Sequence, residues 1–135
     1  MNANNILLVE DDEVDVMDIT RSLEKLKILH NLIVAHNGEE AVVILTKSKQ
    51  LPDIVLIDIN MPKMNGLELL GHIRQNPEWK HLKCFMLTTS DHKTDRQSAK
   101  HLKVSGYLIK PLKLSSPSTM DSFNLMIDLM NFKSI

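Results

Sequence analysis

The chain has 135 residues, of which 43% are apolar and 24% are charged, and its formal net charge at pH 7 is −1. This length suits a single domain, and the composition is typical of a globular protein that buries a full core. The small net charge gives no electrostatic reason to expect nucleic acid or an anionic membrane surface as a partner, and no apolar run approaches the roughly 18 residues of a membrane span.

The first residues and the cysteine usage indicate a compartment. No basic region followed by an apolar region opens the chain, so we expect no secretory signal. The single cysteine, Cys84, lies among apolar residues and cannot form an internal disulfide. We therefore expect a cytoplasmic protein in which Cys84 is a small buried hydrophobe.

The first part of the chain predicts two strand-helix units. Residues 5–9 form an apolar run that ends in three acids, and residues 13–29 then carry apolar side chains at spacings of three and four, as a helix does. Residues 32–35 predict a second strand, closed by the Asn-Gly turn at 37–38, and residues 39–49 predict a short helix.

The third strand is the most informative stretch. Residues 54–57 are four consecutive apolar residues that end on Asp58, and such a run is typical of a strand buried on both faces of a parallel sheet. A helix is expected at residues 65–75, followed by a fourth strand at 84–87. Asp58 is therefore expected at the carboxyl end of an interior strand, the edge where ligands bind in open α/β sheets.

The rest of the chain predicts a polar helix at residues 91–103, a fifth strand at 106–109 and a last helix at 119–133. Five alternations of strand and helix, without a repeat or a linker, predict an α/β fold: one domain, residues 1–135, with a doubly wound sheet of five parallel strands. Connections between the strands are expected to be right-handed crossovers.

Polar side chains gather at the carboxyl ends of four of the five predicted strands. They are Glu10 and Asp11 after the first strand, Asp58 after the third, Thr88 after the fourth and Lys110 after the fifth. Two carboxylates about 4 Å apart repel by about 4 kcal/mol at an effective dielectric constant of 20, so positive charge must lie among them. Lys110 supplies one unit of charge, and a divalent cation would supply two.

The ligand types favour magnesium over zinc. The candidate ligands are carboxylate oxygens, and no cysteine or histidine stands at ligand spacing. Mg²⁺ held by one or two carboxylates keeps open positions that suit phosphate oxygens, so the site fits phosphoryl transfer with Asp58 as the nucleophile. Which of Glu10, Asp11 and Asp12 would contact the metal directly stays open. The acids could also merely cap the first helix.

Four motifs together resemble the response-regulator receiver domain, which is CheY-like in fold. They are V-E-D (Val9 to Asp11), D-I-N-M-P (Asp58 to Pro62) followed by N-G, L-T-T-S (Leu87 to Ser90), and G-Y-L-I-K-P (Gly106 to Pro111). They stand in the family's order over nearly the whole chain, and the third motif is most similar to phytochrome-associated regulators. The resemblance implies a flavodoxin-like (βα)5 fold with strand order 2-1-3-4-5, and a stand-alone receiver without an output domain.

The resemblance also implies a phosphorylated aspartate. Asp58 resembles the residue that accepts a phosphoryl group from a sensor histidine kinase or a phosphotransfer protein. Glu10 and Asp11 resemble the acidic pair that, with Asp58 and the backbone carbonyl of Asn60, holds Mg²⁺, with Mn²⁺ as an alternative.

The family's switch residues have counterparts here as well. Thr88 resembles the hydroxyl that moves to bond a phosphoryl oxygen, and Lys110 the lysine that pairs with that group. Tyr107 resembles the aromatic residue that swings inward when the hydroxyl moves. The bond between Lys110 and Pro111 is expected to be cis by the same resemblance.

Two other functions remain as alternatives. An aspartate-nucleophile phosphatase of the haloacid-dehalogenase type needs a second aspartate two residues after the nucleophile, and this chain has Asn60 there. We therefore expect a switch and not an enzyme with turnover on other substrates. A receiver-like interaction module that is never phosphorylated is compatible with the same residues, because the sequence indicates competence and not use.

The last helix is apolar almost all round, which is typical of a helix buried on more than one side. Its apolar side chains form two stripes, one of Met120, Phe123, Ile127 and Met130 and one of Met126, Leu129 and Phe132. We expect an apolar patch on the face of the fourth helix, fifth strand and fifth helix, and a homodimer through it. The interface residues expected are Phe123, Met126, Leu129 and Met130, and a further protein target is not identified.

Overall fold

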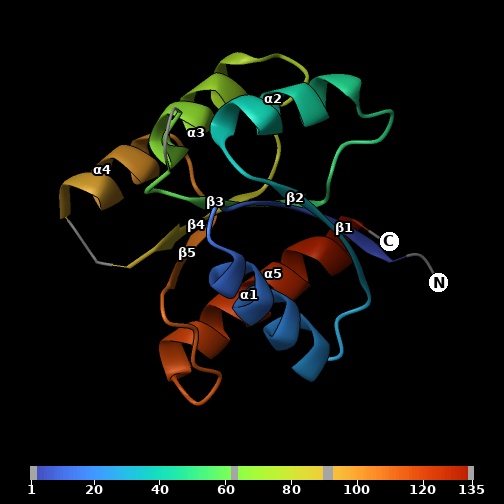
Figure 1. Cartoon of the computed structure of the whole chain (residues 1–135), viewed down its shortest axis with the longest axis vertical. Coiled ribbons are helices and arrows are strands. Elements are labelled where there is room, and N and C mark those ends of the chain that lie inside the picture. Colours follow the sequence, from blue (N-terminus) through green and yellow to red (C-terminus); the bar gives the residue numbers. More distant parts are fainter. Residues whose placement is uncertain (1–2, 62–63, 90–92, 134–135) are drawn as a thin grey trace.

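The computed structural model describes residues 3–61, 64–89 and 93–133, in which a parallel sheet lies between two layers of helices (Figure 1). The strands are β1 Asn4–Val9, β2 His30–Ala35, β3 Ile54–Asp58, β4 Cys84–Thr88 and β5 Gly106–Ile109. The helices are α1 Glu13–Lys25, α2 Gly38–Lys47, α3 Gly66–Gln75, α4 Lys93–His101 and α5 Pro117–Lys133. Neighbouring strands are parallel in the order β2-β1-β3-β4-β5, which confirms the predicted fold.

The sheet is covered on both faces. Helices α2, α3 and α4 lie on one face, and α1 and α5 lie on the other (Figure 1). Strand β3 is buried along its whole length between β1 and β4, as its continuous apolar run predicts. Strand β2 lies at the edge and alternates between half-buried and exposed residues up to the buried Ala35.

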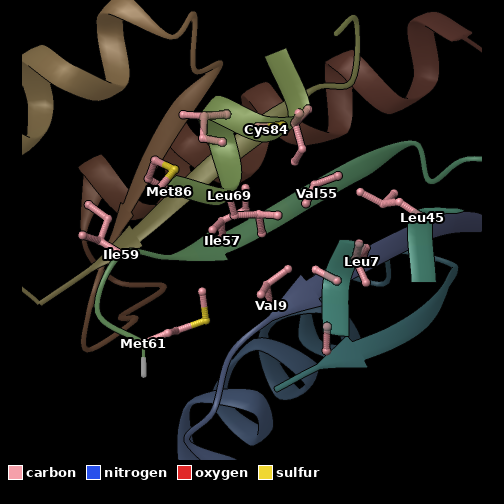
Figure 2. Packing of buried hydrophobic residues seen from close by; sticks show 14 of the residues in the cluster. Leu7, Val9, Leu45, Val55, Ile57, Ile59, Met61, Leu69, Cys84 and Met86 are labelled. Carbon is pink, nitrogen blue, oxygen red and sulfur yellow. The ribbon is translucent and has the colours of Figure 1, made fainter. Parts of the chain in front are cut away.

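Successive side chains of each central strand serve two different cores. Leu7 and Val9 of β1 pack on the side of α2 and α3, with Val55, Ile57 and other apolar residues (Figure 2). The residues between them point to the layer of α1 and α5. Both sides of the central strands are therefore apolar, and the sheet can carry charge only at its ends.

Cys84 lies in the first of these cores and is fully buried, as expected. Burial raises the pKa of its thiol to about 11, and the nearby Arg74 only partly offsets this effect. The thiol is therefore protonated at neutral pH and acts as a hydrophobic side chain.

Helix α1 is shorter than predicted, because it ends at Lys25 and not near residue 29. Lys27 has a φ of 56°, and the amides of Lys27 and Ile28 donate to the carbonyls of Glu24 and Leu23. This is the Schellman pattern, which usually places glycine where Lys27 stands. The apolar spacing continues across that turn, so the sequence pattern alone gave no sign of the helix end.

The expected interface residues of the last helix belong mostly to the core. Phe123 and Met126 are 0% exposed and Met130 is 1% exposed, and all three pack against the sheet with β1, β3 and β4 residues. Leu129 is half-buried against the same core. The prediction that these side chains form a dimer interface is therefore wrong for Phe123, Met126 and Met130, because α5 is buried more deeply than its two stripes suggested.

Arg74 of α3 joins two connections that flank β4. Its guanidinium donates hydrogen bonds to four backbone carbonyls, those of Lys80, Leu82, Leu102 and Lys103, at 2.8 to 3.1 Å. The acceptors lie after α3 and after α4. One side chain thus fixes the end of α4 relative to β4.

No helix within residues 3–61, 64–89 and 93–133 is long and apolar enough to cross a membrane.

Gly66 allows α3 to begin directly against the end of β3. Its amide donates to the carbonyl of Ile59 at 3.0 Å, and Asn65 caps the helix by accepting from the amide of Glu68 at 2.9 Å. A Cβ at position 66 would lie 2.2 Å from the carbonyl oxygen of Asp58. The Asn-Gly pair therefore brings the helix and its loop close to Asp58.

Replacing Gly66 with alanine should lower the free energy of unfolding by about 2 kcal/mol, because the new methyl group meets backbone that cannot move cheaply. Gly71→Ala is the control, since no neighbouring atom of the described residues lies within 4 Å of a Cβ there. That variant should gain about 0.5–1 kcal/mol from helix propensity. Urea unfolding measures both, and equal effects of the two variants would contradict the close approach.

Candidate functional site

The predicted strand-end residues lie together at one edge of the sheet. Glu10 follows β1, Asp58 ends β3, Thr88 ends β4 and Lys110 follows β5. The strand register sets Val9 beside Ile57, Asp58 beside Leu87 and Thr88 beside Ile109, so these ends are level. Glu10, Asp58 and Thr88 are buried, and the Lys110 side chain is 9% exposed.

Three of the acids form a compact cluster. One carboxylate oxygen from each of Glu10, Asp11 and Asp58 lies within 4.8 Å of the others, with Asp11 exposed and the other two buried. Oxygen donors at this spacing, open to solvent on one side, fit a hard divalent cation that keeps part of its water. Asp12 is outside the cluster and caps α1, because its carboxylate accepts from the amides of Val14 and Asp15.

The ammonium of Lys110 lies among carboxylates from three elements. Its Nζ is 2.6 Å from Glu10 Oε1, 2.8 Å from Asp15 Oδ2 and 3.3 Å from Asp58 Oδ2. Sequence reasoning identified Glu10 and Asp58 but missed Asp15. An acid in the first turn of a helix usually indicates only a favourable interaction with the helix dipole, so the signal was not specific.

Burial and neighbouring charges shift the pKa values of Glu10 and Lys110. Burial and the neighbouring Asp58 carboxylate, which Lys110 only partly offsets, together raise the pKa of Glu10 to about 8. Burial alone would lower the pKa of Lys110, but the hydrogen bonds to Asp15 and Glu10 and the charges of Asp58 and Glu10 outweigh it, and the pKa is raised. Lys110 is therefore fully charged at neutral pH.

The loop after β3 bends back over the nucleophile candidate. The amide of Asn60 donates to Asp58 Oδ1 at 3.1 Å, and the Asn60 side chain is exposed. The bond between Lys110 and Pro111 is cis, as the resemblance implied. Pro62 and Ser90, which complete two of the motifs, lie outside the described residues.

Tyr107 connects β5 to α4. Its hydroxyl donates to the backbone carbonyl of Arg96 at 3.0 Å, and the Arg96 guanidinium carbon lies 4.5 Å from the ring centre. The ring borders a hollow of about 500 Å³. The hollow is lined by Arg96, Gln97, Lys100, Val104, Ser105, Gly106 and Tyr107. Thr88 lies on the neighbouring strand, where its carbonyl accepts from the Lys110 amide at 2.7 Å.

A parallel sheet of order 2-1-3-4-5, with an acidic cluster, a threonine and a lysine at its carboxyl edge, defines the class of CheY-like receiver folds. Comparison with known proteins agrees. A family model described as the response regulator receiver domain matches residues 6–117. The chain therefore belongs to the response-regulator receiver domain family.

The relatives include phytochrome response regulators. Response regulator Rcp1 of Synechocystis sp. is 35% identical over 114 residues, which cover 81% of this chain and 78% of that protein. The bacteriophytochrome response regulator AtBRR has a TM-score of 0.80 at 28% identity, covering 97% of this chain and 94% of that one. These matches confirm the predicted subgroup.

Two solved structures of relatives contain a metal ion or a phosphoryl group. The Mn²⁺-bound form of Rcp1 has a TM-score of 0.74 at 31% identity, covering 98% of this chain and 93% of that one. The phosphorylated cyanobacterial phytochrome response regulator RcpA has a TM-score of 0.75 at 26% identity, covering 98% and 92%.

The stability of the metal-free protein should depend on Glu10. Because its pKa is raised from 4.5 to about 8 in the folded state, its contribution is fully present below pH 4.5 and is lost as the pH rises through 8. The free energy of unfolding should fall over this range by up to about 1.4 kcal/mol per pH unit from this group.

Urea unfolding with a metal chelator, at several pH values from 5 to about 8.5, measures this slope. Glu10→Gln should remove most of it, while Asp15 and Asp58 still pair with Lys110 in the variant. Parallel pH profiles of the wild type and the variant would contradict the assignment to Glu10.

Proposed function

We propose that this protein is a phosphorylation switch in which Asp58 accepts a phosphoryl group from a phosphohistidine of a sensor histidine kinase or phosphotransfer protein. A carboxylate oxygen of Asp58 attacks phosphorus, the P–N bond to the donor histidine breaks, and an aspartyl phosphate forms. The observation that carries the proposal is the position of Asp58. It lies at a buried strand end, 3.3 Å from an ammonium and within an acidic cluster.

Glu10, Asp11 and Asp58 are the residues that would hold a divalent cation, together with the backbone carbonyl of Asn60. The cation would be Mg²⁺, with Mn²⁺ as an alternative that the Mn²⁺-bound form of Rcp1 supports. When bound, it would neutralise charge on the transferring phosphoryl group. Asp11 is the exposed member of the cluster, so the cluster is open to solvent there.

Lys110 and Thr88 supply the remaining contacts. The Lys110 ammonium lies beside Asp58 and would donate to a phosphoryl oxygen, and charge-assisted bonds of this kind are the strong ones in proteins. Thr88 is buried at the end of β4, the strand next to β3. Its hydroxyl would reach the phosphoryl group after a movement of the strand end.

The output would be a population shift between two conformers. Moving a switch from about 1% to about 99% active takes roughly 5.5 kcal/mol of differential stabilisation, which several charge-assisted bonds to a phosphoryl group can supply. Tyr107 supports a route to the surface, because an inward movement of its ring would break the hydroxyl bond to the Arg96 carbonyl. The hollow between α4 and β5 would then change shape.

A turnover phosphatase is less well supported. The residue two positions after Asp58 is Asn60, whose amide side chain cannot act as a general acid or base in place of a carboxylate. An interaction module that is never phosphorylated would not require an ammonium beside a buried acidic cluster. Reaction with a small phosphodonor tests both alternatives, because the absence of modification would favour the interaction module and sustained phosphate release would favour the phosphatase.

Incubating the protein with Mg²⁺ and acetyl phosphate should add one phosphoryl group that hydroxylamine removes, and intact mass spectrometry detects it. Asp58→Asn should abolish the modification while the circular dichroism spectrum stays unchanged. No mass gain in the wild type would contradict the switch. Sustained release of phosphate, in place of a single lasting phosphoryl group on the protein, would favour the phosphatase.

The face formed by α4, β5 and α5 is proposed to change on phosphorylation and to bind a protein partner, including a second copy of the chain. With Phe123, Met126 and Met130 in the core, the exposed large apolar side chains of β5 and α5 among the described residues are Ile109, 37% exposed, and Leu125, 40% exposed. Leu125 lies beside Gly106 of β5. Gly106 also lines the hollow beside Tyr107, and a Cβ placed on Gly106 would lie 3.6 Å from Leu125 Cδ2, so Leu125 is near that hollow. The homodimer therefore has support from a smaller surface than the sequence suggested.

Sedimentation velocity at micromolar concentration should show a larger dimer fraction when Mg²⁺ and beryllofluoride, a phosphoryl analogue, are present. Leu125→Glu should reduce that fraction several-fold. Val43→Glu is the control, because Val43 is 49% exposed on α2, which covers the opposite face of the sheet from α5. A protein that sediments only as a monomer in both states would contradict the dimer.

A further inference from the structure

Asp15 is a carboxylate in contact with the ammonium of the site, although it stands apart from the acidic cluster. Its Oδ2 lies 2.8 Å from Lys110 Nζ, and the two residues are 95 positions apart in the chain. The cluster that could hold a cation consists of Glu10, Asp11 and Asp58 and does not include Asp15. The contact that joins Asp15 to the site is therefore its ion pair with Lys110.

The position of Asp15 is fixed by the start of α1. Asp12 caps the helix and accepts from the amide of Asp15, so the first turn is set by a neighbour and not by Asp15 itself. The Asp15 side chain is 26% exposed. A cavity of about 10 Å³ beside the pair, lined also by Asp18 and Leu87, holds about one water molecule at most, so solvent screens the pair poorly on that side.

Lys110 donates hydrogen bonds to Glu10 and Asp15 and forms a longer ion pair with Asp58. An ammonium has three N–H donors, and three carboxylates surround Nζ, with Glu10 and Asp15 closer than Asp58. The carboxylate oxygens of Asp15 and Asp58 thus lie within about 6 Å of each other, a range over which unit charges interact strongly in a partly buried site. A phosphoryl group on Asp58 would bring further negative charge into this range.

We propose that Asp15 is a positioning residue that holds Lys110 towards α1, and that its negative charge favours the cation and opposes the phosphoryl group. This inference rests on the proposed function. The charge of Asp15 attracts a divalent cation at the acidic cluster, and it repels an anionic phosphodonor while sharing the ammonium that the phosphoryl oxygens need. The two effects have opposite signs, and a loss of folded structure would not produce that combination.

Asp15→Asn tests the proposal, because asparagine keeps an acceptor for Lys110 and loses the charge. Isothermal titration calorimetry with Mn²⁺ should show affinity weaker by about threefold or more. The initial rate of modification by acetyl phosphate, at saturating Mn²⁺, should rise by about threefold or more. Asp15→Glu, which restores the charge, should return both values towards those of the wild type.

Asp18→Asn is the matched control. This substitution removes the same charge about one turn further along α1. No ion pair between Asp18 and Lys110 is found among the described residues. Its effects on both measurements should be clearly smaller than those of Asp15→Asn. Equal effects of the two variants would mean that only the overall charge of α1 matters, which would overturn a role through Lys110.

Other outcomes also decide the proposal. A fall in both Mn²⁺ affinity and modification rate would assign Asp15 a merely structural role, and unchanged values would remove it from the site's function. If the wild type is not modified at all, the proposed function fails, and the Mn²⁺ affinities alone then show whether Asp15 acts on the charge of the site.

Discussion

The contact between the Lys110 ammonium and three carboxylates is the interaction on which this site depends. Glu10 and Asp58 are buried, and a buried carboxylate without a partner costs several kcal/mol. Lys110 supplies the partner from the position after β5, although β4 lies between β5 and β3. The long lysine side chain therefore reaches across the end of β4, where Thr88 is located.

The sheet order makes that contact possible. Strands β1 and β3 are neighbours, so Glu10 and Asp58 come from adjacent strand ends, and the apolar cores on both faces leave charge only at the ends of the central strands. Helix α1 starts at the same edge and contributes Asp15. A change of strand order would separate these groups, so the charge balance of the site depends on the topology of the sheet.

Much of this arrangement could be predicted from the sequence. The apolar run of β3 is interrupted by Asp58, and parallel strands end at a common edge, so polar residues after each strand had to meet. The order 2-1-3-4-5 could not be obtained from periodicity and came from the family resemblance. The same resemblance supplied the roles of Thr88 and Tyr107, which remain proposals.

The missed features have physical reasons. The end of α1 depends on a lysine at a positive φ, where the apolar pattern gives no signal. Which side chains of α5 are exposed depends on how deeply the helix packs against the sheet. The sequence pattern therefore suggested that Phe123 and Met126 could contact a partner, although both lie in the core. The contacts of Asp15 and Arg74 join residues far apart in the chain, and an isolated charge on a helix does not indicate its partner.

The proposed function requires that the chemistry of the site is directed at Asp58 and not at its acidic neighbours. After reaction with acetyl phosphate and Mg²⁺, borohydride reduces an aspartyl phosphate to homoserine, and peptide mass spectrometry locates the converted residue. If Asp58 is the phosphoryl acceptor, homoserine should appear at position 58 alone. Conversion at Asp11, Asp12 or Asp15, or no conversion at any position, would contradict it.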